Sequence, residues 1–175
     1  ELESFVRHPS EAMRIAAVVA LRRLGGIKEL TKFIKDDSPQ VMSDAVRAIY
    51  DEAETQTFLD HPKSLSGIAG ALDPQHPPAV NFRAIAANRR LGTFASAKRI
   101  STFLANPNLS HTLRIQALYA LESWPRASQL DPIDGRYFPV LAGDMDALNA
   151  AIGPEIWALA KDADDNISRQ AIAVL

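Results

Sequence analysis

The sequence predicts an all-α fold, a superhelix of about five stacked helix pairs. Between Glu11 and Gly25 apolar residues return every three or four positions, as on one face of an α-helix. The same pattern, centred on a small alanine, returns further along the chain. Proline and glycine stand between the periodic stretches, where helices begin and end. Together these observations favour a stack of helices.

The repeats can be aligned on one small residue, which allows close packing against a neighbouring helix. The five anchors are Ala17, Ala45, Ala84, Ala117 and Ala171. Apolar residues stand four positions earlier, at Met13, Val41, Val80, Leu113 and Ile167. Four positions later stand Leu21, Ile49, Asn88, Leu121 and Leu175, a series that only Asn88 breaks. We expect these positions, together with Ala20 and Leu24 in the first repeat, to face the core.

Helix boundaries can be assigned in order from the amino end. Ser10 is expected to accept hydrogen bonds from the first free amides of the first helix. Gly25 and Gly26 end this helix, and the spacing from Ile27 to Lys35 predicts its partner. Ser38 is a good N-cap for the next helix. The partner helices of the later repeats are less uniform and are expected at 55–59, 65–72, 94–104, 145–152 and 155–161.

An irregular insertion is expected at 125–144, on the rim of the superhelix. Pro125, Pro132 and Pro139 prevent one continuous helix there. Asp131-Pro132 and Asp134-Gly135 are turn signals, and residues 136–140 are β-prone. We therefore predict an ordered excursion from the helical stack.

Composition excludes several classes of function. The 19 Lys and Arg residues are balanced by 21 Asp and Glu, which leaves a net charge of -2 and no global field for nucleic acid. The absence of cysteine excludes disulfides, thiolate metal sites and CxxCH haem attachment within these residues. The longest apolar run, residues 15–21, is far shorter than the roughly 20 residues that span a membrane.

No catalytic, cofactor-binding or metal-binding residue is predicted, and no cofactor is expected. Phosphate-loop, dinucleotide, zinc-protease and serine-hydrolase motifs are absent from the sequence. The four histidines fall in different repeats, too far apart for one ion, and the aspartates near the insertion lack the spacing of a calcium loop. The pairs Arg22-Arg23 and Arg89-Arg90 are interpreted as complements of the negative helix ends, with a partner-binding basic stripe as the alternative.

Three stretches resemble a known family: HPSEAMRIAAVVALRRLGG at 8–26, FRAIAANRRLGT at 82–93 and LRIQALYALESWPRASQLDPIDGRYFPV at 113–140. They look like the HEAT-repeat (armadillo-type α-solenoid) region of large planctomycete-type multidomain proteins. Those proteins resemble membrane-bound or sorbosone-type dehydrogenases, with a β-propeller before the HEAT region and a c-type haem module after it. The segment from Trp124 to Pro139 is the most specific part of the resemblance.

The resemblance implies an exported parent protein, in the periplasm or at the cell surface, in which residues 1–175 form a single HEAT-repeat domain. The chain would then be a fragment of a larger protein, and its apolar carboxyl end would allow self-association. Catalytic and haem-ligating positions of the family lie in other domains, so none is carried over to this sequence.

We therefore predict a non-catalytic scaffold for protein–protein or interdomain contacts, with recognition on the exposed face of the first helix of each pair. The candidate partner-binding residues are Arg14, Asp44, Arg47, Arg83 and Arg114. Two alternatives remain open. One is a nucleic-acid-binding HEAT protein of the alkylpurine-glycosylase kind, and the other is an enzyme-like lyase or hydroxylase HEAT module.

Overall fold

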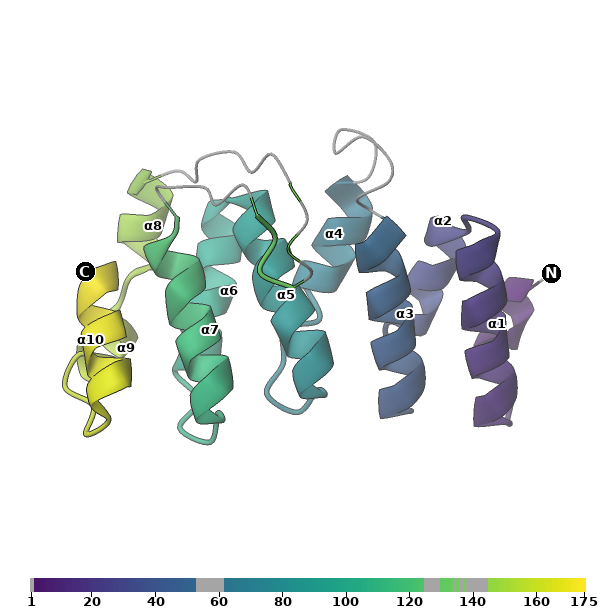
Figure 1. The fold of residues 1–175 in the computed structure, drawn as a ribbon, viewed down its shortest axis with the longest axis horizontal. Helices are drawn as coiled ribbons and strands as arrows, with labels where there is room; N and C mark the ends of the chain where they lie inside the picture. The colour runs from purple at the N-terminus through teal and green to yellow at the C-terminus, as the bar shows by residue number, and fades with distance from the viewer. Residues whose placement is uncertain (1, 53–61, 125–129, 134, 136, 138–144) are drawn as a thin grey trace. The chain divides into compact units, whose positions relative to one another are not determined.

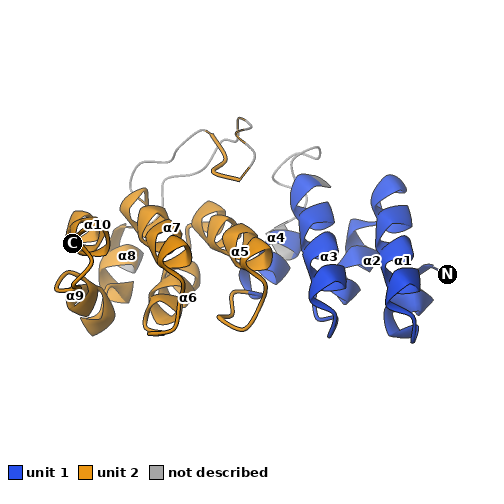
Figure 2. Ribbon diagram, turned by 60° about the horizontal axis from the view of Figure 1, so that its bottom comes forward, with its two compact units in different colours: residues 1–71 blue, residues 72–175 orange. Residues whose placement is uncertain are grey.

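The computed structural model describes residues 2–52, 62–124, 130–133, 135, 137 and 145–175. The regular elements in these ranges are all helices, which confirms the predicted all-α class (Figure 1). The helices divide into two compact units, Glu1–Ala71 and Leu72–Leu175 (Figure 2). The expected single domain over 1–175 and its superhelical stacking stay predictions.

The first unit contains two layers of helices. One layer holds α1 (Glu11–Arg23) beside α3 (Pro39–Glu52). The short helix α2 (Ile27–Leu30), the 3-10 turn Thr31–Phe33 and α4 (Pro62–Ala69) pack behind them. A 3-10 helix at Leu2–Arg7 leads into α1. Residues 24–26 join α2 to α1 by a short connection, as in a helical hairpin.

Large aliphatic and aromatic side chains fill the space between the two layers of the first unit. Leu30, Phe33, Ile49 and Ile68 are completely buried, and the two anchor alanines Ala17 and Ala45 are buried among them. The small anchors allow α1 and α3 to approach closely, because a larger side chain would hold the two backbones apart.

The second unit repeats this arrangement of two layers. Its front layer holds α5 (Pro78–Leu91), α7 (His111–Glu122) and α10 (Asp165–Val174), with α7 packed against both of the others (Figures 1 and 2). Its second layer holds α6 (Phe94–Leu104), α8 (Met145–Ala151) and α9 (Pro154–Leu159). Trp124, directly after α7, is completely buried in the core of this unit.

Most of the predicted core positions are confirmed. All five anchor alanines are buried, and so is Asn88, which satisfies its amide by donating to the carbonyl oxygen of Ala84 at 2.9 Å. Met13, Leu24 and Leu175 are exceptions, because each is exposed near the end of its helix.

Helix ends follow the predicted signals with one correction. Ser38 accepts a hydrogen bond from the Val41 amide, and Gly92 ends α5 with a left-handed φ of 59°. Ser10 makes no side-chain cap, and its own amide donates to Nδ1 of His8. The helix predicted at 55–59 lies outside the described residues, as does most of the insertion at 125–144. None of the described helices is long and apolar enough to cross a membrane.

Candidate functional site

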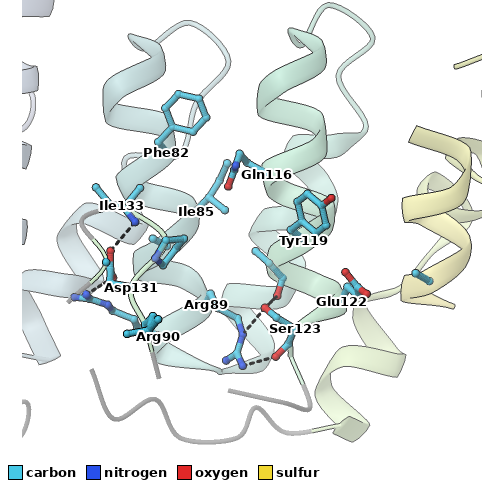
Figure 3. Close-up of a pocket in the computed structure, with 16 residues that line it drawn as sticks. Phe82, Ile85, Arg89, Arg90, Gln116, Tyr119, Glu122, Ser123, Asp131 and Ile133 are labelled. Carbon is cyan, nitrogen blue, oxygen red and sulfur yellow. Dashed lines mark hydrogen bonds and ion pairs between the residues drawn. The ribbon is translucent and has the colours of Figure 1, made fainter. Parts of the chain in front are cut away.

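A hollow of 770 Å³ lies between α5 and α7 in the second unit (Figure 3). Its volume falls within the range of about 300–1,000 Å³ that is typical of ligand sites. Residues 130–133 and Gly135, from the described part of the predicted insertion, form one of its walls. The hollow is thus built from two helices and the segment that follows the second of them.

The helical residues that line the hollow recur at intervals of three and four, because such positions share one face of a helix. On α5 they are Phe82, Ile85, Ala86 and Arg89. On α7 and its end they are Gln116, Tyr119, Ala120 and Ser123. Both helices place apolar residues in the middle of the hollow and polar groups towards their carboxyl ends.

Arg89 lies where α5 ends, and its guanidinium is bonded to the end of α7 (Figure 3). Its Nη2 donates to the carbonyl oxygens of Ser123 and Trp124, and its Nε donates to Oγ of Ser123 at 3.2 Å. The guanidinium carbon also lies 5.4 Å from the centre of the Trp124 ring, within cation–π range. Arg89 therefore caps carbonyl groups that α7 itself leaves without partners.

The positive charge of Arg89 has no carboxylate partner in the described part of the chain. Its Nη1 is buried and donates no hydrogen bond there, and the acceptors of its other two nitrogens are all neutral. Burial lowers the pKa of this guanidinium from its ordinary value, yet the group stays charged at neutral pH. Buried cations are normally paired, so an anion is the complementary ligand at this end of the hollow.

Arg90, the next residue, forms a buried ion pair with Asp131. Asp131 holds the wall of the hollow in shape, because its Oδ1 accepts from the Ile133 amide at 2.7 Å and its carbonyl oxygen accepts from the Gly135 amide at 2.9 Å. Gly135 has a φ of 73°, which favours glycine. The predicted Asp-Pro turn is thus confirmed, and Leu130 and Tyr137 form an isolated antiparallel bridge around it.

The burial of Arg89 and Arg90 corrects the sequence interpretation of this pair. Both were expected as surface complements of a helix end, but the structure places them in the interior of the second unit. One signal was available: Asn88 breaks the apolar series immediately before them, which indicates a polar interior at the end of this helix. Their partners, at residues 123–124 and 131, follow too far along the chain for periodicity to identify.

Arg14 and Arg114 have equivalent contacts in the two units. Arg14 binds Asp36 at 2.8 Å and the carbonyl oxygen of His8 at 2.7 Å. Arg114 binds Asp162 at 3.4 Å and the carbonyl oxygen of Pro107 at 2.9 Å. Each arginine therefore joins the loop before its own helix to the loop before the next helix of the same layer.

The other three candidate face residues are more accessible. Arg47 is 61% exposed and lies 3.6 Å from Asp51. Asp44 accepts a hydrogen bond from Gln40 at 3.0 Å, and Arg83 donates to the carbonyl oxygen of Ala79. The hollow does not include any of the five, and their role in recognition stays a prediction.

The described residues contain no group of three or more His, Asp or Glu side chains that could hold a metal ion. Two of the histidines make local contacts. Nδ1 of His8 accepts from the Ser10 amide, and Nε2 of His111 lies 3.3 Å from Asp164, the N-cap of α10. Both contacts lie at the start of a helix, α1 for His8 and α10 for His111.

Comparison with known proteins gives no further identification. A scan against models of protein families finds no match to this chain, and a comparison with curated protein sequences also finds none.

Proposed function

We propose that the chain is a non-catalytic helical-repeat scaffold of the HEAT type that binds another protein. The observation that supports this most is the hollow between α5 and α7, which gathers apolar side chains that remain accessible to solvent. Tyr119 is 50% exposed and Leu130 is 59% exposed, and both line the hollow. Contiguous exposed apolar side chains of this kind mark interaction sites.

We propose a protein as the partner because a protein surface is large enough to cover the hollow together with the exposed side chains at its edge. On the HEAT resemblance, this partner is a neighbouring domain of an exported, dehydrogenase-like parent chain, such as its propeller or its haem module. A separate protein would use the same face in the same way.

Nucleic acid is less well supported as the partner. Three of the four candidate arginines are paired with carboxylates: Arg14 with Asp36, Arg47 with Asp51 and Arg114 with Asp162. A nucleic-acid-binding surface needs cations available to neutralise phosphates. Retardation of duplex DNA by the purified chain at low salt would favour this alternative.

Site-specific photo-crosslinking in the source cells tests the proposed function. A photoreactive phenylalanine analogue replaces Tyr119, and the matched control carries it at Phe94, an exposed aromatic position of the same unit outside the hollow. A protein crosslinked from position 119 and not from position 94 is then purified and titrated against the wild-type chain.

We expect Tyr119→Ala to weaken this reconstituted complex about tenfold, as for a central interface aromatic, and Phe94→Ala to leave it within about twofold. Equal crosslinking from both positions, or equal affinity of both variants, would contradict the proposal.

A further inference from the structure

We infer that the hollow between α5 and α7 recognises an extended acidic-x-aromatic segment of a partner protein, with the acidic side chain bound by Arg89. The inference rests on the proposed function, because it names the chemistry of the partner that the scaffold would bind. It is argued from the charge of Arg89, the apolar middle of the hollow and the spacing between them.

The acidic residue is required by the unpaired charge of Arg89. This guanidinium is about nine-tenths buried, and its Nη1 has no hydrogen-bond partner in the described part of the chain. Arg89 lines the hollow, so a carboxylate bound in the hollow beside it would supply the missing negative charge.

The aromatic residue fits the apolar middle of the hollow. Ile85 and Tyr119 lie on its two helical walls, and Ile133 lies on the wall formed by the turn after Asp131 (Figure 3). An aromatic side chain buries a large apolar area between such walls at little cost in conformational entropy.

The spacing between the two features sets the separation of the partner residues. Ile85 precedes Arg89 by about one helical turn, roughly 5–6 Å along the axis. In an extended chain, side chains two positions apart point to the same side at a separation of roughly 7 Å. An acidic residue and an aromatic residue two positions apart, as in an acidic-x-aromatic segment, therefore match Arg89 and the apolar middle together.

A protein segment is favoured over a free organic acid by the exposure of the rim. Binding sites for small molecules enclose most of their ligand. Here Tyr119 and Leu130, at the edge of the hollow, each leave half or more of their surface to solvent. A polypeptide that continues beyond the hollow would cover them.

Glu122 supplies an internal check, because it is an acidic residue at the edge of the same hollow. It is exposed and accepts a hydrogen bond from Nε2 of Gln170 on α10. Its negative charge opposes an acidic ligand, so its removal should tighten binding. A residue with only a structural role would not have this effect.

The test titrates the isotope-labelled full chain with short blocked peptides and follows its amide resonances by NMR. The probe is N-acetyl-Glu-Ala-Phe-amide, and the matched controls replace its Glu by Gln or its Phe by Ala. We expect each control to bind about tenfold more weakly, with resonance shifts on α5 and α7. 3-Phenylpropionate tests whether the hollow binds a small organic acid, and it should bind more weakly than the tripeptide.

Three variants locate the interaction on the protein. Arg89→Gln should abolish the preference for Glu over Gln, and Ala120→Phe should block the hollow without altering a charge. Glu122→Gln should tighten the Glu probe about twofold and leave the Gln control unchanged. Phe94→Ala is the matched control for the fold and should bind as the wild type does.

Equal binding of the Glu and Gln peptides, or a Glu preference that persists in Arg89→Gln, would overturn the inference. So would binding of 3-phenylpropionate as tight as that of the tripeptide, since it would assign the hollow to a small acid. A crosslinked partner that binds but is not displaced by the tripeptide would overturn the inference while leaving the proposed function intact. Peptide binding as predicted without any crosslinked protein partner would instead count against the proposed function.

Discussion

Arg90 and Asp131 form an ion pair in the interior of the second unit although 41 residues separate them in the sequence. Their side chains are 2% and 1% exposed. Because Arg90 ends α5 and Asp131 begins the turn that walls the hollow, this pair fixes the position of the wall against the helix.

Removal of one partner from this pair should be strongly destabilising. Arg90→Ala or Asp131→Ala leaves an uncompensated buried charge, which typically costs about 3–5 kcal/mol. Urea denaturation followed by circular dichroism measures this loss. The double variant Arg90→Met with Asp131→Leu should lose less than either single variant, and additive losses would show that the two charges are not coupled.

The equivalent contacts of Arg14 and Arg114 predict equivalent losses of stability. Each arginine binds a carboxylate and a carbonyl oxygen in a mostly buried position, so Arg14→Ala and Arg114→Ala should each cost about 1–3 kcal/mol. The control is Arg47→Ala at an exposed pair, which should change the free energy of unfolding by at most about 0.5 kcal/mol. Losses of similar size at all three positions would contradict a specific role for the two loop-joining arginines.

The N-cap of α10 should make stability depend on pH. Hydrogen bonds from the amides of Ile167 and Asn166, aided by His111, lower the pKa of Asp164 from its ordinary 3.8. A lowered pKa in the folded state means that the ionised cap stabilises above pH 3.8 and that this contribution is lost as the pH falls through the lowered value.

The effect of this cap is measured as the melting temperature at a series of pH values. Asp164→Ala should lower the melting temperature at neutral pH. In this variant the melting temperature should also fall less steeply than in the wild type as the pH is lowered. Ser110→Ala, which removes the neutral N-cap of α7, should lower the melting temperature by a similar amount at every pH. Parallel curves for wild type and Asp164→Ala would disprove the linkage.

Two glycines of the first unit should respond to alanine in opposite directions. Gly25 has a φ of 69° after α1, so Gly25→Ala forces a left-handed alanine and should cost about 1–2 kcal/mol. Gly67 lies within α4, where an added Cβ would meet only Cδ1 of Ile34 at an ordinary 3.6 Å. Gly67→Ala should therefore stabilise by about 0.5–1 kcal/mol. Thermal denaturation measures both, and a loss of stability at Gly67 would show that α4 cannot accommodate the methyl group.

Much of the helical framework could be predicted from local pattern. The anchor alanines are buried as expected, α3 begins directly after the predicted cap Ser38, and α6 spans the predicted residues 94–104. The exceptions are Met13, Leu24 and Leu175, which follow the expected periodicity but are exposed near the ends of their helices. Periodicity identifies which side of a helix is apolar. It does not show how far along the helix neighbouring elements bury that side.

The candidate site was harder to predict, because it depends on contacts between distant residues. The pair Arg89-Arg90 looks like Arg22-Arg23 in sequence, since both precede Leu-Gly at a helix end. In the structure Arg23 is exposed, whereas Arg89 and Arg90 are buried. The difference arises from Ser123, Trp124 and Asp131, which supply acceptors to the second pair.

The sequence by itself therefore determined the all-α class, the core-facing positions and most of the helix ends, because these follow from local period, capping and backbone preference. Only the tertiary structure decided which arginines are buried and where the hollow lies. A buried charge is stable only where specific acceptors converge on it, and that convergence exists only once α5, α7 and the turn at Asp131 are packed together.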